Sequence, residues 1–365
     1  MRSDSIVPEK RVYDFLIVGQ GLAGSLLAWQ LMRRGQRGRV LDDGHKTASS
    51  KVAAGLINPL AGMRFNHSPF VHQWLEALER CYGKLEEAAG RRFLHWQAMV
   101  RLFRSPEQVR FFERRAADPH DRDLLGRRFG PDQSGEPVHA PHGGFIQRRT
   151  GHLDLPALLA FMATWLNERE ALQHADVDFD GIQLHDETVR IGKLAGRHLV
   201  FCDGYRSMHN PWFGYLPFAP DKGEFLVLEA AADALSSRLP RRIVNGAHWL
   251  LPHADGYYRL GSTHDHRHQD QQPTEAGRRR LTEGMKELLL HPDALQLRDH
   301  QAGVRPATSD RQPFLGTHLQ ERRLHIFNGF GAHGSISIPW YSERMVQWLL
   351  HGEPLPENAD IRRFA

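Results

Sequence analysis

The chain has 365 residues, which is enough for two domains and a large buried core, and 47 basic against 43 acidic side chains leave a formal net charge of only +4. The basic residues are scattered along the sequence, whereas a nucleic-acid surface typically gathers them in one stripe, so no nucleic-acid partner is expected. Two cysteines exclude a disulfide scaffold, no apolar stretch approaches the roughly 20 residues of a membrane span, and residues 1–19 lack a secretory pattern, so we expect a cytoplasmic protein.

The start of the chain predicts a nucleotide-binding unit. Residues 13–18, YDFLIV, form an apolar run of strand length, and residues 22–35 place apolar side chains at helical spacing before a terminal glycine. A second short strand is expected at residues 39–42. A strand, a turn, a helix and a strand within about 30 residues form the unit that carries the dinucleotide fingerprint.

The turn of this unit reads GQGLAG, an intact GxGxxG motif. Gly19 allows the tight turn, Gly21 lets the backbone approach a pyrophosphate at the helix N-terminus, and Gly24 lets the helix pack closely. Asp42 ends the second strand, where a carboxylate can accept the ribose hydroxyls and disfavours the 2′-phosphate of NADP. The alternative is a tight glycine turn in some other α/β protein.

Three later segments rich in small residues distinguish FAD from NAD. Residues 49–59, SSKVAAGLINP, permit close backbone approach and offer hydroxyls to phosphate. Residues 303–311, GVRPATSDR, precede an apolar strand at residues 324–327. Residues 328–336, NGFGAHGSI, then open a helix around residues 340–350, and a glycine-rich segment before a helix can hold an anion or a polar ring edge.

Together with GHLD at residues 151–154 and CDG at residues 202–204, these segments resemble the D-amino-acid oxidase superfamily of flavoproteins, which includes glycine oxidase and sarcosine oxidase. The resemblance covers nearly the whole chain and is closest to the layout of glycine oxidase from HWLLP at residues 248–252 onward. It implies an α/β fold, with a Rossmann-like FAD-binding domain of the glutathione-reductase type and a substrate domain whose mostly antiparallel sheet is flanked by helices. The implied FAD-binding domain is discontinuous, at residues 1–90, 140–215 and 300–365, and the substrate domain takes residues 91–139 and 216–299.

Local patterns in the substrate domain agree with this layout. Residues 224–228, 248–251 and 256–261 are short strand-like runs separated by turn residues. Residues 281–290 are expected to be helical, and residues 131–144, which carry Pro, Gly and Ser, are expected to form a loop between domains.

The resemblance also implies which residues contact FAD. The fingerprint and Asp42 would hold its ADP part, the segment after the second strand its pyrophosphate, ribityl chain and flavin, and the turn before the last helix the polar edge of the flavin. Val177, in an expected strand, would meet the adenine with its backbone. By position, the expected contacts are Gly19, Gly21, Leu22, Ala23, Gly24, Asp42, Ser49, Ser50, Ala54, Gly55, Leu56, Val177, Gly204, Gly331, Ala332, His333, Gly334, Ser335 and Ile336.

Three departures from the family pattern concern the cofactor. Ala332 and His333 stand where glycine oxidase-like proteins have an arginine and then a polar residue, and Asp203 stands where a small neutral residue is usual. Neither cysteine falls at the position of covalent flavin attachment, so noncovalent FAD is expected.

Four side chains are candidates for the catalytic site. Arg305, in the GVRP context, matches the arginine that pairs with the substrate carboxylate, and a planar guanidinium suits that task; the alternative is a structural salt bridge to Asp310. Trp249 matches a pocket aromatic, with core packing as the alternative, and His264 follows on the same rim. Arg259 lies near the position of a lysine that assists oxygen in sarcosine oxidases, although a solvated surface position is favoured.

The alternating histidines of HDHRHQD, at residues 264–270, would share one face if the segment were a strand, which suggests a metal site. Because the segment follows a strand end and the family has no catalytic metal, a surface loop without metal is favoured.

The resemblance therefore implies an FAD-dependent oxidoreductase that oxidises a C–N bond of a small amine or amino acid. A hydride would pass to the flavin, and dioxygen or another acceptor would reoxidise it. The substrate is expected to be a small molecule, with a carboxylate if Arg305 has the family role. The alternatives are a 2-hydroxy-acid oxidase or dehydrogenase, a tRNA-modifying flavin oxidase, and a flavin-binding protein without turnover.

Overall fold

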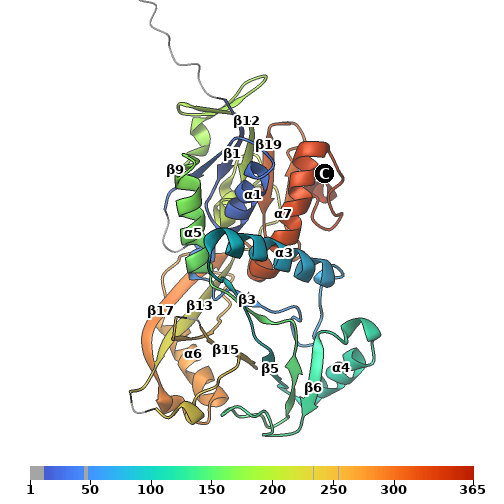
Figure 1. The fold of residues 1–365 in the computed structure, drawn as a ribbon, viewed down its shortest axis with the longest axis vertical. Helices are drawn as coiled ribbons and strands as arrows, with labels where there is room; N and C mark the ends of the chain where they lie inside the picture. Colours follow the sequence, from blue (N-terminus) through green and yellow to red (C-terminus); the bar gives the residue numbers. More distant parts are fainter. Residues whose placement is uncertain (1–11, 45–47, 233, 254) are drawn as a thin grey trace, which may run out of the picture.

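Two large sheets lie one above the other along the long axis of the molecule (Figure 1). The structure is a computed structural model that describes residues 12–44, 48–232, 234–253 and 255–365. In this described part of the chain, none of the helices combines the length and the apolar character needed to cross a bilayer.

The upper sheet has the order β10-β11-β12-β1-β2-β9, with β19 beside β12 and β18 beside β19. Strands β9, β2, β1, β12 and β19 run parallel, and β10, β11 and β18 pair antiparallel with their neighbours. Its strands are β1 (Val12–Val18), β2 (Gly38–Asp42), β9 (Leu172–His174), β10 (Ile182–Leu184), β11 (Val189–Ile191), β12 (Leu194–Phe201), β18 (Phe314–Thr317) and β19 (Leu324–Asn328). The central strands are apolar on both faces, as parallel strands covered on both sides must be.

Helices α1 (Leu22–Met32), α5 (Leu155–Asn167) and α7 (Gly334–His351) cover one face of this sheet, and α3 (Val71–Ala89) packs on α7. They form one core in which Leu26 of α1 and Met345 of α7 are fully buried with Ile17 of β1. The opposite face is buried by a second cluster that includes Phe213 and Leu216. The Rossmann-like part of the fold prediction is therefore confirmed.

The lower sheet has the order β17-β13-β16-β15-β14-β5-β7-β6. All its pairs are antiparallel except β14 with β5. Its strands are β5 (Met99–Leu102), β6 (Leu125–Phe129), β7 (Gly144–Gln147), β13 (Asp221–Ala230), β14 (Val244–Asn245), β15 (Trp249–Pro252), β16 (Tyr258–Gly261) and β17 (Leu295–Arg305). Helix α6 (Glu275–Leu288) packs Leu281 and Leu288 on it, and α4 (Pro106–Ala116) lies beside β6 in Figure 1.

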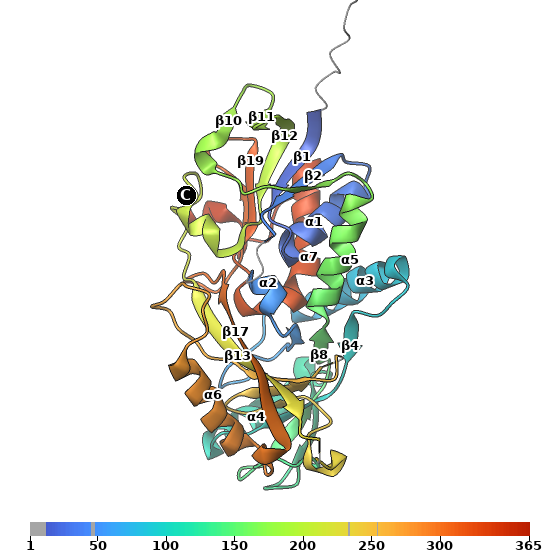
Figure 2. The same cartoon turned by 90° about the vertical axis from the view of Figure 1, so that its left-hand side faces the viewer.

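A small sheet and a short helix connect the two halves. Strands β3 (Leu56–Ile57), β8 (Gly151–Leu153) and β4 (Leu94–Trp96) form the sheet. Helix α2 (Ser49–Val52) lies between the upper helices and strands β13 and β17 (Figure 2). The segment that the sequence assigns to the flavin thus runs between the two large sheets.

Three local expectations need correction. Val177 lies in the loop after β9, because Asp178 accepts a hydrogen bond from the amide of Asp180 and caps a short 3₁₀ helix there. Helix α6 begins six residues before the expected start, because Thr274 caps it through Gly277 N. Residues 131–144 connect β6 to β7 within the lower sheet, since a cluster of Pro and Gly predicts a turn but not the elements it joins.

The division into an FAD-binding and a substrate domain stays a prediction. Two of the expected domain boundaries do not coincide with the edge of the lower sheet. The boundary at residue 140 puts β7, which pairs with β5 and β6, on the cofactor side. The boundary at residue 300 falls inside β17.

Candidate cofactor and substrate site

One cavity of about 710 Å³ lies between the two large sheets and is lined by residues of both. Its size is that of a pocket that encloses a small-molecule ligand or cofactor. It runs from the first turn of α1, which we name the cofactor end after the sequence prediction, to strands β13, β15, β16 and β17, which we name the substrate end. Every site residue expected from the sequence lines it except Gly24 and Arg259.

The GxGxxG turn is shaped by contacts that leave no room for side chains. Gly19 has a φ of 101°, and a Cβ there would lie 2.5 Å from the carbonyl oxygen of Cys202 on the neighbouring strand. A Cβ on Gly24 would overlap the carbonyl oxygen of Gly19, so this glycine serves helix packing outside the cavity. A Cβ on Gly21 would stand 3.3 Å from Ser50 Oγ, at the cavity wall.

The first turn of α1 lines the cavity with Gly21, Leu22 and Ala23, and a helix N-terminus suits a phosphate. Ser50 Oγ accepts from Leu22 N at 3.1 Å, which brings the hydroxyl segment of α2 against the first turn of α1. The carboxylate of Asp42 accepts from Gln20 N at 2.7 Å and Gly44 N at 2.8 Å. It is thereby fixed at the end of β2 with lone pairs left for a ribose.

A second helix N-terminus faces the same cavity. Helix α7 starts at Gly334, and Gly331, Ser335 and Ile336 line the cavity with it. The turn is anchored just beyond the end of β17, because Gly331 N donates to the carbonyl oxygen of Pro306 at 3.1 Å. The positive ends of two helix dipoles therefore converge on one cavity.

Asp203 is a partly buried acid at the cofactor end. Its Oδ1 accepts from Ser207 Oγ and, at 3.5 Å, from Asn328 Nδ2, while Oδ2 is buried without a partner among the described residues. Burial raises the pKa of Asp203 to about 6, although the Ser207 hydrogen bond opposes the shift.

These observations fit a bound dinucleotide. The glycines are placed where a side chain would fill the cradle, two helix N-termini suit phosphate and a polar ring edge, and Asp42 suits a ribose. Val177, Gly55 and Gly204 complete the lining of this end.

The substrate end is built on one row of directly paired residues across the lower sheet. Arg101 pairs with Asn245, Asn245 with Trp249, Trp249 with Gly261, and Gly261 with Phe225. All five line the cavity. A Cβ on Gly261 would lie 2.6 Å from the Trp249 ring, so the glycine lets the indole lie across the row.

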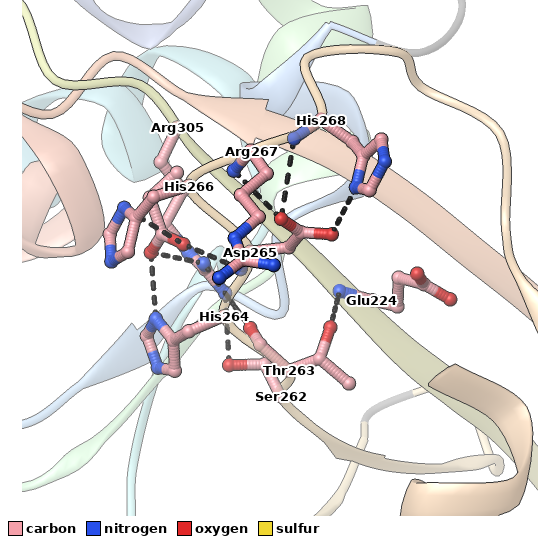
Figure 3. A network of polar contacts seen from close by, with 10 residues as sticks. Glu224, Ser262, Thr263, His264, Asp265, His266, Arg267, His268 and Arg305 are labelled. Carbon is pink, nitrogen blue, oxygen red and sulfur yellow. Dashed lines mark hydrogen bonds and ion pairs between the residues drawn. The ribbon is translucent and has the colours of Figure 1, made fainter. Parts of the chain in front are cut away.

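Arg305, at the end of β17, is partly buried with 18% of its side chain exposed. Its Nη1 donates to Asp221 Oδ2 at 2.7 Å and its Nη2 donates to Ser262 Oγ at 2.9 Å (Figure 3). The guanidinium lies over Gly223, where a Cβ would overlap it. A structural salt bridge, the alternative to a substrate role for Arg305, therefore exists. Its partner is Asp221, whereas Asp310 pairs with Arg363.

Asp221 joins Arg305 to the histidine segment. His264 Nδ1 donates to Asp221 Oδ2 at 2.7 Å, and His266 Nδ1 lies 3.9 Å from Oδ1. Burial alone would raise the pKa of Asp221, but the hydrogen bond from His264 and the charge of Arg305 outweigh burial and lower the pKa. The Asp221 carboxylate is therefore ionised and offsets part of the Arg305 charge.

The three histidines of this segment do not converge on one point. His264 and His266 face Asp221, whereas Figure 3 shows His268 turned to Asp265, whose carboxylate it contacts at 2.7 Å. Within the part of the chain that is described, no group of three or more His, Cys, Asp or Glu side chains is arranged to hold a metal ion.

Arg259, for which the sequence favours a solvated surface position over one near the flavin, does not line the cavity. Both its Nη atoms donate to the Asp255 carboxylate, at 3.2 and 2.6 Å. It lies two positions before Gly261 on β16, which is about 7 Å farther along the strand.

Sequence reasoning missed several lining residues. Asn245 and Ser262, which line the cavity, and Asp221, which binds Arg305 beside it, had no motif around them and are brought in by strand register. Arg101, Arg104, His248 and Arg280 also line the substrate end. The three arginines among them could not be distinguished in an arginine-rich sequence, because no local pattern separates an arginine that lines a cavity from one on the surface.

Comparisons with known proteins agree with this geometry. The family of FAD-dependent oxidoreductases termed DAO matches residues 14–348. The glycine oxidase of Pseudomonas aeruginosa is 25% identical over 368 residues, which cover 94% of this chain and 96% of that protein. The tRNA 5-methylaminomethyl-2-thiouridine biosynthesis bifunctional protein of Azoarcus sp. is 26% identical over 398 residues, covering 95% of this chain and 58% of that protein. The crystal structure of glycine oxidase from Geobacillus kaustophilus shares the fold, with a TM-score of 0.81 at 20% identity over 97% of this chain and 98% of that one.

Proposed function

The chain belongs to the DAO family of FAD-dependent oxidoreductases, and from this premise we propose that it oxidises a C–N bond of a small amine or amino acid. As a family member it is an enzyme with a small-molecule substrate and an electron acceptor. Beyond family membership, we propose that the oxidised bond is a C–N bond, that the substrate is a small amine or amino acid, and that it carries a carboxylate.

The observation that carries the proposal is Arg305 in a cavity continuous with the dinucleotide cradle. A guanidinium held by Asp221, by Ser262 and, at 3.5 Å from both Nη atoms, by the carbonyl oxygen of Thr263 has a fixed orientation, and its positive charge at the cavity wall can attract a substrate carboxylate. Trp249 lies across the row beside it and limits how the rest of the substrate is placed. A substrate held at its carboxylate and limited by the indole has the carbon that is to be oxidised at one position in the cavity.

FAD, when bound, would supply the acceptor for the hydride that leaves the substrate carbon. The chain would handle the proton of the substrate amine. Because His264 Nδ1 donates to Asp221, Nε2 is left as a proton acceptor on a residue that lines the cavity. Among the described lining residues no carboxylate stands at the substrate end, which makes His264 the candidate that we propose for this step.

Noncovalent FAD and dioxygen as acceptor are part of the same proposal. Cys202 lies beside Gly19, at the pyrophosphate end of the cradle, and Cys81 is buried on α3 outside the cavity lining, so neither is placed for attachment near the ring edge at α7. Since Arg259 is bound to Asp255, the positive end of α7 is the feature that would favour negative charge at the cofactor.

A second candidate is oxidation of an amine carried on tRNA. It is favoured by the similarity to the Azoarcus bifunctional protein, of which the chain matches 58%. The scattered arginines of the sequence argue against a nucleic-acid surface.

The test is an anaerobic screen of the purified protein against amines, amino acids and hydroxy acids, with flavin absorbance as the signal. We expect a yellow protein that releases FAD on denaturation and is bleached by an amine or amino acid. A colourless protein that cannot be reconstituted with FAD would contradict the cofactor. Faster bleaching by hydroxy acids, or none by any compound, would contradict C–N oxidation.

A further inference from the structure

The substrate end of the cavity is strongly cationic. Four arginines line it, at positions 101, 104, 280 and 305, together with His248 and His264. The acidic side chains among the described lining residues are Asp42, Asp43 and Asp203, and all three stand at the cofactor end. One substrate carboxylate at Arg305 leaves the other arginines unexplained.

Arg101 is the least expected of them. It is 7% exposed, and its two Nη atoms donate only to backbone carbonyl oxygens, those of Leu60 and Gly62, both at 3.3 Å. Its guanidinium carbon stands 5.3 Å from the centre of the Phe65 ring, and no described carboxylate pairs with it. Burial and the charge of Arg104 lower the pKa of Arg101 to about 10, so it is still a cation at neutral pH. A buried cation without an anion is costly, and an anionic ligand would offset that cost.

Arg104 and Arg280 stand at the same part of the cavity. Both are exposed, and the guanidinium of neither has a partner in the described chain. Gly284 on α6 packs against the His248 ring, and Arg280 stands one turn before Gly284 on that helix. Arg104 follows Arg101 by three residues, just beyond the end of β5, and all three arginines line the cavity with His248. Burial, followed by the charges of Arg280 and Arg104, lowers the pKa of His248, and Glu287 opposes the shift.

Arg101 is far from Arg305, whereas Arg280 lies on α6, which packs against β13, the neighbour of β17. Arg101 lies on β5 and Arg305 on β17, five strand steps apart in the order of the lower sheet. At about 4.8 Å per step, their backbones are separated by about 24 Å. A substrate as small as an unsubstituted amino acid cannot contact both ends.

We propose that Arg101, Arg104 and Arg280 form a second anion subsite, and that the substrate is an elongated amine or amino acid with one anionic group for Arg305 and another for this subsite. The inference rests on the proposed function for the amine, but the subsite itself is a binding property. The second group is a carboxylate or a phosphate-like anion, since arginine binds both.

The first experiment measures binding to the FAD-loaded protein by calorimetry. The probes are glutarate, adipate and suberate, each compared with the monocarboxylate of the same chain length, and 5-phosphonopentanoate. We expect at least one dianion to bind about tenfold or more tightly than its monoanion, because a second charge pair forms in a partly enclosed site. Equal affinities of every dianion and its monoanion would overturn the proposal. A preference for the phosphonate or for the dicarboxylate identifies the chemistry of the second group, and either supports the subsite.

The second experiment locates the effect. Arg104→Gln and Arg280→Gln should each weaken the dianion by about three- to tenfold and leave the monoanion unchanged. Arg279→Gln is the matched control, because Arg279 is exposed on the same helix and does not line the cavity. Equal effects of Arg279→Gln and Arg280→Gln would mean a general charge effect and overturn the assignment.

Arg101→Gln separates a binding role from a structural one. In the absence of anions we expect its melting temperature to match or exceed that of the parent, because an unpaired buried charge is removed. A drop of several degrees would show that Arg101 holds the fold and would remove it from the subsite. Dianion binding without any amine oxidation would reject the proposed function but keep the subsite, whereas amino-acid oxidation without preference for a second charge would do the reverse.

Discussion

At the cofactor end of the cavity, the groups that face a ligand are mainly backbone amides and glycines at the connections of a parallel sheet. At the substrate end they are side chains on neighbouring strands of an antiparallel sheet, from Arg101 to Phe225. A backbone cradle cannot change its ligand without a change of chain path, whereas a row of side chains can be altered one residue at a time. Relatives with one cofactor and different substrates are the natural result.

The strongest test of this difference is Gly21→Val at the cofactor end. A Cβ there already lies 3.3 Å from Ser50 Oγ, so two further methyl groups must enter the space of the pyrophosphate. We expect complete loss of flavin, measured by absorbance after reconstitution. Gly83→Val is the control, because a Cβ at Gly83 meets nothing within 4 Å. Normal flavin content in Gly21→Val would show that the turn is only structural.

At the substrate end, Arg305→Ala should keep FAD but lose about 30-fold or more in the efficiency of flavin reduction by a carboxylate substrate. The physical reason is an unpaired substrate charge in a partly buried site. Arg305→Lys should recover only part, because a point charge cannot replace the planar fork. Stopped-flow reduction measures both, with the exposed Arg298→Ala on the same strand as control. An equal loss with a decarboxylated analogue would assign Arg305 a structural role.

A smaller effect is expected from Asp221→Asn. The ionised Asp221 offsets part of the Arg305 charge, and its neutral isostere leaves that charge to the ligand. Monocarboxylate inhibitors should therefore bind about three- to tenfold more tightly, as titration of the flavin spectrum would measure. Weaker binding would mean that orientation by Asp221 matters more than the charge it offsets.

The smallest effect concerns stability at the cofactor end. Burial raises the pKa of Asp203 to about 6, so the native protein keeps this proton while the unfolded chain releases it near pH 4. Stability of the FAD-free protein should fall between about pH 4 and pH 6, and Asp203→Asn should recover about 1–3 kcal/mol above pH 7. Urea unfolding at pH 5 and pH 8 measures this, with the exposed Glu187→Gln as control. An equal change at both pH values would exclude titration of Asp203.

The two ends also differ in how far the sequence alone predicts them. The unit of β1, α1 and β2 follows from an apolar run, three glycines and one acid within 30 consecutive residues, where local physical rules apply. The turn before α7 is predictable for the same reason. At the substrate end, Arg305 and Asp221 are 84 residues apart and meet only because β13 and β17 pair in that register. No local pattern carries this information, and the same holds for Asn245 in the two-residue strand β14.

The arrangement of α1 and α7 has a consequence during biosynthesis. Both helices belong to one buried core, yet more than 300 residues of chain separate their starting points, Leu22 and Gly334. At about 10 residues per second, a ribosome needs about half a minute between them. Throughout that time the apolar side of α1, with Leu26, Leu27 and Leu31, lacks its final neighbour. Until α7 has been synthesised, the nascent chain therefore exposes an apolar surface on α1 and lacks one wall of the cavity.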